Sequence, residues 1–441
     1  MKKTKYILSS LILLVIAIAC VDKADVYEFP VDKYYYDIPD VPVTEDYVIG
    51  VRYNVIDSGY WFDKSKKQVE YHTGNPVLDS GDSIYKYFHK NYEAGWPTTV
   101  EQSVSGVLEQ HLKWGKQAGI DFFVLGWGGP GWNDTLLTRW EQLCAQDNAY
   151  PKVVLRFDPG WMLGKGRIRD NPLTNDTLQR DPLRMDSLRF YIDSIYDSVL
   201  QKPFNYKTKE GKPVMILCNY VNKYPGEIID LKGFVNEFRV RNNNNLHLIG
   251  ELNRNLTSPE FWGYRGEETK GTIKSDTLTN FDAVYIENIT TGSYDRWAGY
   301  YSFIDYNYGY WKQHSDQIGT EYIPTIFPAY DNKVRQMWQD NRPFWDGDYV
   351  IARWSKANNK PYVISATAEN QPSGTALELN LENTKDNPYK TLANVAKRNV
   401  GKSRIIMVYS WNDFRIGNNL EPVKEFNEEY LNYTKEFFKK K

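Results

Sequence analysis

The chain contains eight short apolar segments, and stretches with helical periodicity lie between them. The segments span residues 47–54, 120–127, 152–158, 213–219, 246–251, 282–288, 322–327 and 404–409. Strands that alternate with helices are typical of a parallel sheet, because a parallel connection must cross over the sheet. Eight such units predict an α/β fold, a single (β/α)8 TIM barrel.

Two of the connecting helices are predicted at residues 100–118 and 185–200, where apolar side chains recur at helical spacing. Gly119 is expected to end the first helix, because helices often end in a left-handed residue. Residues 361–366 are an alternative ninth strand, and residues 242–245 are predicted as a loop at the bottom of the barrel.

The N-terminal residues have the pattern of a bacterial lipoprotein signal peptide. Lysines come first, an apolar run follows over residues 6–19, and Cys20 comes next. We expect residues 1–19 to be removed and Cys20 to carry the lipid; a plain secretory signal that happens to precede a cysteine is the alternative. Residues 20–45 have no periodicity and are predicted as a tether. Residues 46–441 are then a barrel held at a membrane in the cell envelope, in the periplasm or at the cell surface.

The composition excludes several classes of function. The 54 basic and 56 acidic residues form no cluster that would bind nucleic acid. The five histidines follow no metal-binding motif, and neither do Cys144 and Cys218. We therefore expect no nucleic-acid partner, no metal, no cofactor and no disulfide. The 34 Tyr and 14 Trp residues favour a glycan partner, because these side chains stack on sugar rings.

Polar and aromatic side chains follow nearly every predicted strand, the position at which TIM barrels build their active sites. Several carboxylates at one rim fit carbohydrate chemistry, in which one carboxyl protonates the leaving oxygen and a second acts on the opposite face of the ring. The alternative for each acid is an ion pair or a helix cap, and Asp158, close to Arg156, is a candidate for such a structural role. The candidate site residues are Tyr53, Trp127, Asp158, Tyr220, Glu251, Glu287, Tyr330, Asp331, Trp411, Asn412 and Asp413.

The segment 410–422, after the last predicted strand, resembles a motif of glycoside hydrolase family 99 and of the WbsX-like proteins. The family pattern is close to Trp-Asn-Glu-Trp-x-Glu-Gly followed by Leu/Ile-Glu-Pro. Asp413 stands in place of the first glutamate and Ile416 in place of the second. Segments 117–129, 209–214 and 327–332 are similar to other family segments, in the same order along the chain. The resemblance covers the whole predicted barrel and implies the same fold.

The resemblance also implies roles for residues. In family 99 the first acid of the motif is thought to act as a base on the 2-hydroxyl of the sugar, and the second protonates the departing oxygen. Asp413 is then the base, but Ile416 cannot donate a proton, and general acid help contributes about a hundred- to ten-thousandfold in rate. Glu287 and Glu251 are the candidate replacements because both are long acids at strand ends. The predicted catalytic residues are Asp413, Glu287 and Glu251, in that order.

Two functions remain open. The first is a cell-envelope glycoside hydrolase that degrades an α-linked, mannose-rich glycan by carboxylate acid/base chemistry, with the endo-α-mannosidase-like action that the resemblance implies. The second is a noncatalytic glycan-binding lipoprotein on the same barrel, because Ile416 replaces the acid. Glycosyl transfer, ascribed to WbsX-like proteins, is disfavoured, since the signal peptide places the domain outside the cytoplasm. Aromatic residues in segments 54–97 and 288–317, both predicted as loops, are expected to line the substrate site.

Overall fold

The computed structural model describes residues 36–53, 103–127, 129–130, 134–158, 182–218, 231–252, 278–287, 301–331, 350–351, 353–355, 360–362, 387–412, 418–422 and 426–441. The predicted signal peptide, Cys20 and the aromatic segment 54–97 lie outside these residues. Residues Ile38–Lys441 form one compact unit. Among the described residues, no helix is both long and apolar enough to span a bilayer.

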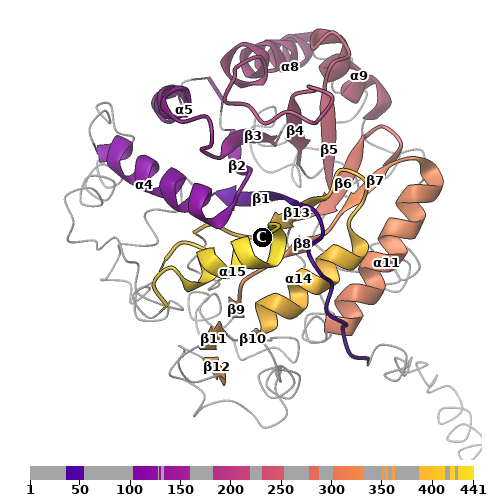
Figure 1. The fold of residues 1–441 in the computed structure, drawn as a ribbon. Coiled ribbons are helices and arrows are strands. Elements are labelled where there is room, and N and C mark those ends of the chain that lie inside the picture. Colours follow the sequence, from indigo (N-terminus) through magenta and orange to yellow (C-terminus); the bar gives the residue numbers. More distant parts are fainter. Residues whose placement is uncertain are drawn as a thin grey trace, which may run out of the picture. The chain divides into compact units, whose positions relative to one another are not determined.

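The central sheet contains nine strands in the order β7-β6-β5-β4-β3-β2-β1-β13-β8, and each pair of neighbouring strands is parallel. The strands are β1 (Val48–Tyr53), β2 (Phe122–Trp127), β3 (Lys152–Phe157), β4 (Val214–Leu217), β5 (His247–Leu252), β6 (Ala283–Ile286), β7 (Glu321–Ile323), β8 (Thr325–Ile326) and β13 (Ile405–Val408). The sheet curves into a nearly closed barrel (Figure 1). All eight predicted segments lie in it, so the predicted (β/α)8 barrel is confirmed.

The seventh predicted strand, residues 322–327, is divided at Pro324 into β7 and β8. Proline has no N–H to donate to a neighbouring strand, so a ladder is readily interrupted there. Strand β7 pairs with β6, whereas β8 pairs with β13, where Met407 donates its N–H to the carbonyl oxygen of Pro324 at 2.9 Å. One segment therefore joins both edges of the sheet.

Apolar side chains at alternate strand positions fill the interior of the barrel. Gly50 on β1 is required by close packing, because a Cβ atom there would lie 2.2 Å from the ring of Phe122 and 2.8 Å from the sulfur of Met407. Residues two apart on a strand share a face, so polar residues that continue this alternation also point inward. The core cluster comprises Phe122, Val124, Val154, Val214, Ile216, Ile249, Ala283, Tyr285, Ile323, Ile405 and Met407.

Helices surround the sheet (Figure 1). They include α4 (Ser103–Ala118), α5 (Asp134–Gln146), α8 (Pro182–Ile195), α9 (Leu231–Arg241), α11 (Tyr301–Ile318), α14 (Pro388–Asn399) and α15 (Glu429–Phe438). The predicted helix 100–118 corresponds to α4, and Gly119 follows it with a φ of 70°, as expected. The predicted helix 185–200 corresponds to α8 and the π-helix η4 (Tyr196–Leu200) that continues it.

The prediction of a loop over residues 288–317 is wrong from residue 301 onward, where the chain forms α11. Aromatic residues recur there at helical spacing, and Tyr301, Tyr308 and Trp311 are buried. Trp311 stacks on Tyr322 of β7 with ring centroids 6.0 Å apart. Tyr308, whose ring centroid lies 5.5 Å from that of Tyr322, and Trp311 therefore pack the helix onto the barrel wall.

Short strands outside the barrel account for the alternative ninth strand. Strand β12 (Lys360–Tyr362) overlaps the predicted segment 361–366, but it pairs antiparallel with β11 (Arg353–Ser355) in a separate sheet. Strands β9 (Tyr330–Asp331) and β10 (Val350–Ile351) form another such pair. Residues 242–245 connect α9 to β5, so they lie at the amino-terminal end of the strands, and the predicted bottom loop is confirmed.

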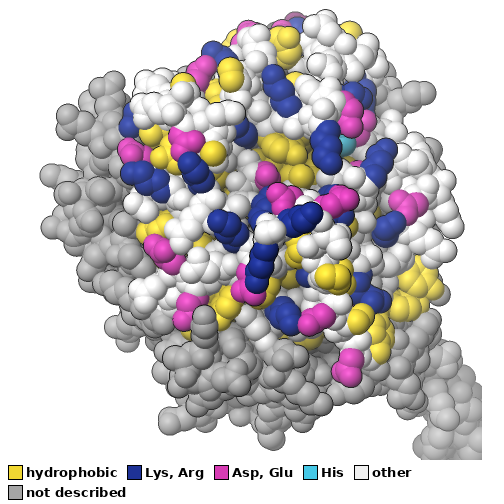
Figure 2. Space-filling model, viewed as in Figure 1, with side chains coloured by type: hydrophobic (Ala, Val, Ile, Leu, Met, Phe, Trp, Pro, Cys, Tyr) yellow, Lys and Arg dark blue, Asp and Glu magenta, His cyan; other side chains and the backbone are white. Residues whose placement is uncertain are grey.

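The N-terminal segment of the compact unit lies on α14. Asp40 accepts hydrogen bonds from Lys390 and Asn394, both at 2.8 Å, and Lys397 donates to the carbonyl oxygen of Val41 at 2.6 Å. Basic and acidic side chains are intermixed on the face that carries α15 (Figure 2). This face therefore has no extended field of one sign.

Candidate functional site

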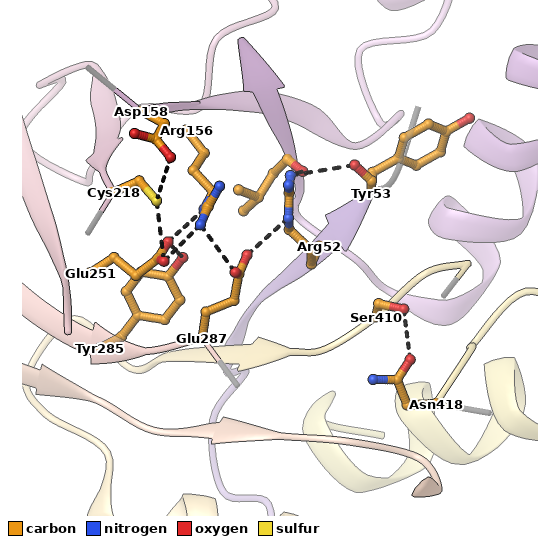
Figure 3. Close-up of polar contacts among 11 residues, drawn as sticks. Arg52, Tyr53, Arg156, Asp158, Cys218, Glu251, Tyr285, Glu287, Ser410 and Asn418 are labelled. Atoms are coloured by element: carbon orange, nitrogen blue, oxygen red, sulfur yellow. Dashed lines mark hydrogen bonds and ion pairs between the residues drawn. The ribbon is translucent and has the colours of Figure 1, made fainter. Parts of the chain in front are cut away.

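Several charged and polar side chains meet inside the barrel near the carboxyl ends of its strands (Figure 3). Each lies two residues beyond a position at which the same strand faces the interior, so the alternation of the strand turns it inward. Barrel enzymes assemble their active sites at this end. The inward pairs are Gly50 and Arg52, Val154 and Arg156, Ile216 and Cys218, Ile249 and Glu251, and Tyr285 and Glu287.

Arg156 of β3 and Glu251 of β5 form a bidentate ion pair inside the barrel. The Nε atom of Arg156 lies 2.5 Å from one carboxylate oxygen of Glu251, and its Nη2 atom lies 2.7 Å from the other. Glu251 is only 4% exposed. Burial alone would raise the pKa of this carboxyl, but the charge and hydrogen bonds of Arg156 hold the pKa below its ordinary value. Glu251 is therefore an ionised carboxylate.

Glu287 lies between two arginines. One of its carboxylate oxygens is 2.9 Å from the Nε atom of Arg52, and the other is 3.2 Å from the Nη2 atom of Arg156. Its side chain is 16% exposed, which is more than the 5% of Glu251. Arg156 thus joins the two glutamates, and Glu287 is the one that retains contact with solvent.

Two protonated groups complete the hydrogen bonds of Glu251. The hydroxyl of Tyr285 donates to it at 3.0 Å, and the thiol of Cys218 donates to it at 3.3 Å. Burial raises the pKa of Tyr285 and that of Cys218 well above their ordinary values, so both keep their protons. Cys218 also lies 3.7 Å from a carboxylate oxygen of Asp158. A protonated, buried thiol is a poor nucleophile, so Cys218 acts here as a hydrogen-bond donor.

We call this group of side chains the interior cluster; it comprises Arg52, Arg156, Asp158, Cys218, Glu251, Tyr285 and Glu287. Its arrangement limits the chemistry that it can perform. Arg156 favours the ionised form of Glu251, and an ionised carboxylate accepts hydrogen bonds but cannot donate them. Such groups suit the binding of sugar hydroxyls. Among the residues that the structure describes, no group of three or more His, Cys, Asp and Glu side chains could hold a metal ion.

The turn after β13 is hydrogen-bonded both within itself and to β1. The backbone N–H of Trp411 donates to the carbonyl oxygen of Arg52 at 2.7 Å, and that of Glu421 donates to the carbonyl oxygen of Trp411 at 2.8 Å. Ser410 and Asn418 are joined by a side-chain hydrogen bond of 2.9 Å (Figure 3). The Leu-Glu-Pro part of the motif therefore holds the Trp-Asn part in place.

The structure places the predicted site residues in two groups. Asp158, Glu251 and Glu287 meet in the interior cluster. Tyr53 and Trp411 lie on the outer side of the wall, where both contact His111.

Trp127 also points outward, against Phe157 and Tyr191, with ring centroids 5.6 and 5.8 Å away. Asn412 is buried, with 4% of its surface exposed. Asp413 and Tyr220 lie outside the described residues, and only the backbone of β9, with Tyr330 and Asp331, is described.

Sequence reasoning missed Arg52, and it named Arg156 only as a neighbour of Asp158, whereas Arg156 pairs with Glu251 and Glu287. Arg52 and Arg156 each stand inside an otherwise apolar strand, two positions beyond an inward residue. A buried arginine needs an acidic partner, so the two-residue spacing could have been used to predict that these arginines point inward and pair with acids. Tyr285 could have been found in the same way, because it precedes Glu287 by two residues on the same face. His111 carried no such signal.

Solved structures share this architecture. The chain is similar to a "glycoside hydrolase-like protein", with 19% identity, a TM-score of 0.60, and 93% of this chain and 99% of the other covered. It is also similar to a family GH99 endo-α-mannosidase from Bacteroides thetaiotaomicron in complex with bis-tris-propane, with 16% identity, a TM-score of 0.52, and coverage of 89% and 97%. The chain has a glycosidase-like barrel fold. No family model matches the sequence, and no curated protein sequence matches it.

Proposed function

We propose that this chain is a cell-envelope glycoside hydrolase that acts on an α-linked, mannose-rich glycan. The interior cluster carries the proposal, because it gathers carboxylates and arginines at the end of the barrel where substrates bind. The similarity to an endo-α-mannosidase fold supports the barrel, and the family-like motif after β13 supports the substrate class.

Glu287 is the proposed contact to the sugar. It is fixed by Arg52 and Arg156 and is more exposed than Glu251. Its carboxylate accepts hydrogen bonds from sugar hydroxyls. Glu251 is proposed as a positioning residue that does not itself contact the sugar, because it holds Arg156 with two short hydrogen bonds. The two glutamates thus have different roles although they share one arginine.

Asp413 is the proposed base. It follows Trp411 and Asn412, and the backbone of Trp411 is hydrogen-bonded to Arg52, whose side chain pairs with Glu287. In this proposal Asp413 removes the proton of the 2-hydroxyl, and the 2-oxygen displaces the leaving oxygen at the anomeric carbon. The leaving oxygen then takes its proton from water in this proposal, because Ile416 has none to give and Glu251 and Glu287 are each paired with arginines. Water subsequently opens the anhydrosugar.

A noncatalytic glycan-binding protein is the second candidate. One observation favours it: the described glutamates of the cluster are paired with arginines, and Ile416 stands where the resemblance implies an acid. An ion-paired cluster can hold sugar hydroxyls without any proton transfer. The same residues then serve binding alone.

Incubation of the purified protein with α-mannans and high-mannose N-glycans tests the proposal, with products analysed by mass spectrometry. We expect cleavage by the wild-type protein and a loss of at least about a hundredfold in Asp413→Asn. An aryl glycoside with an acidic leaving group should be cleaved faster than a natural glycan, since no side chain supplies the acid. Binding without cleavage at high protein concentration supports the second candidate, and neither binding nor cleavage contradicts both.

Anchoring through Cys20 belongs to the proposal. We expect the wild-type protein to incorporate labelled palmitate and to partition with membranes, because several acyl chains give stable anchoring. The Cys20→Ser variant should do neither. A variant that still labels and partitions with membranes contradicts the lipoprotein assignment.

A further inference from the structure

Strand β2 brings no side chain into the layer of polar groups that forms the interior cluster. Phe122 and Val124 of this strand face the interior, and by alternation the next inward position is Gly126. The register of the sheet pairs Gly126 with Arg156 of β3, which belongs to the cluster. Gly126 is half-buried, whereas every other residue of β2 is buried. Solvent therefore reaches the strand at this glycine.

The space on the inward side of Gly126 is bordered by the guanidinium group of Arg52. A Cβ atom at Gly126 would lie 3.4 Å from Nη2 of Arg52 and 3.8 Å from its Nη1. Apart from the chain neighbours of Gly126, no other described residue has an atom within 4 Å of that position. At Gly50, by contrast, a Cβ atom would lie 2.2 Å from the ring of Phe122. Packing requires Gly50 but not Gly126, and a glycine inside a strand often marks a place where another group approaches closely.

Arg52 has an unengaged hydrogen-bond donor at this space. Its Nε atom pairs with Glu287 at 2.9 Å, and its Nη1 atom donates to the carbonyl oxygens of Val124 and Tyr53 at 3.1 and 3.5 Å. Among the described residues, its Nη2 atom has no hydrogen-bond or ion-pair partner. The N–H groups of Nη2 are therefore available to a ligand oxygen that lies beside Gly126.

The charges around this space favour a neutral oxygen over an anion. Arg52 is paired with Glu287, and Arg156 is paired with Glu251 and Glu287, so both cations already face carboxylates (Figure 3). A hydroxyl group both accepts and donates hydrogen bonds. Because Nη2 and Nε share one edge of the guanidinium group, a hydroxyl at Nη2 of Arg52 can donate its own hydrogen to Glu287.

We propose that Gly126 is a specificity-determining residue, and that the space beside it receives one hydroxyl group of a neutral sugar. This hydroxyl accepts a hydrogen bond from Arg52 and donates one to Glu287. The inference rests on the proposed function in so far as Glu287 is taken as the contact to the sugar. A side chain at position 126 and a sugar that lacks this hydroxyl remove the same interaction.

Gly126→Ala tests the proposal, because the new methyl group fits the fold but occupies the place of the ligand oxygen. Gly126 is a strand residue without a left-handed φ, and the contact of 3.4 Å with Arg52 is ordinary van der Waals contact. We expect stability in urea equal to or above that of wild type. Affinity for the α-linked mannobiose that wild type binds best should fall at least about tenfold, measured by NMR titration.

Gly309→Ala is the matched control for this substitution. Gly309 lies on α11, outside the barrel interior, and a Cβ atom there would also make an ordinary contact, 3.5 Å from the side chain of Asn399. We expect the control to bind the mannobiose as wild type does.

Analogues of the mannobiose that each lack one hydroxyl identify the group that enters the space. One analogue should bind wild type at least about tenfold more weakly than the parent sugar. The same analogue should bind Gly126→Ala no more weakly than the parent does, because losses that remove one contact are not additive. Arg52→Lys keeps a cation beside Glu287 but has no Nη2 atom, so it should show the same non-additivity. Arg52→Lys decides the test if Gly126→Ala does not fold.

Unchanged affinity in Gly126→Ala overturns the proposal, and so do additive losses for every analogue. A preference of wild type for a uronic acid disaccharide over the mannobioses also overturns it. The expected binding pattern without any cleavage supports the inference and contradicts only the proposed hydrolase. Cleavage of a mannan at an unchanged kcat/KM in Gly126→Ala contradicts the inference alone, and a wild-type protein that binds none of the mannobioses contradicts both.

Discussion

The two ends of the barrel both bury carboxyl groups, but they treat them in opposite ways. At the carboxyl ends of the strands, Arg156 holds the pKa of Glu251 below its ordinary value in spite of burial. At the opposite end, Glu321 accepts hydrogen bonds from the N–H and the hydroxyl of Ser403, at 2.9 and 2.6 Å, and burial raises its pKa. The ionised form of a buried glutamate is therefore favoured at Glu251, which an arginine faces, and disfavoured at Glu321, whose printed hydrogen bonds come from Ser403.

This difference supports the proposed role of the interior cluster in ligand binding. Replacing a buried ion pair by apolar residues of similar volume is often neutral or even stabilising. The barrel can bury a glutamate with neutral partners, as Glu321 shows. In the proposed function, Arg52 and Arg156 at the carboxyl ends of the strands hold Glu251 and Glu287 in position for a ligand.

The largest expected effect is that of Arg156→Met. The substitution removes the cation that faces both Glu251 and Glu287, and breaking a buried pair costs about 3–5 kcal/mol. We expect a loss of this size in the free energy of unfolding at pH 7, measured by urea denaturation. The loss should shrink as the pH falls and Glu251 takes up a proton. A loss below about 1 kcal/mol at pH 7 contradicts the account.

Glu251→Gln should have a smaller effect that depends on pH. Hydrogen bonds to a charged group contribute about 1.5–3 kcal/mol, and we expect the variant to lose that amount at pH 7. The folded-state pKa of Glu251 is lowered, so this stability is present above the unfolded value, near 4.5, and disappears as the pH falls through the folded value. Unfolding curves of both proteins from pH 7 to pH 3 should converge, and a constant gap would refute the ionised state.

The smallest effect, with the opposite sign, is expected for Glu321→Gln. The folded-state pKa of Glu321 is raised, so its ionisation opposes folding as the pH rises above about 4.5. A glutamine can still accept hydrogen bonds from Ser403 and does not ionise. We expect the variant to be equally stable at low pH and more stable by up to about 1 kcal/mol at pH 7. Thermal melts at the two pH values check this, and destabilisation at pH 7 alone would count against it.

Much of the barrel could be predicted from local pattern. The apolar runs and the helical periodicity between them located the strands, because buried parallel strands are short and apolar. The division at Pro324 was not predicted, since it depends on which strands lie at the two edges. The aromatic residues of α11 were misread because a high aromatic content looked like a binding loop, although their spacing was helical.

The site was only partly accessible from sequence. Glu251, Glu287 and Asp158 could be placed at strand ends from the sequence, and the structure brings them together in the interior cluster. Which of them meet Arg156 depends on how far each strand extends around the barrel, and sequence order does not give that register. The contact of His111 with Glu421 joins residues 310 positions apart, so no local pattern reports it.

The most direct test of the central claim compares Glu287→Gln with Glu321→Gln on a glycan that the wild-type protein cleaves. Both substitutions replace one carboxyl of the same barrel by an amide of the same shape, at opposite ends. We expect kcat/KM to fall at least about a hundredfold in Glu287→Gln and to stay within about twofold of wild type in Glu321→Gln. Equal losses in the two variants, or no loss in Glu287→Gln, would contradict the assignment of the interior cluster as the active site.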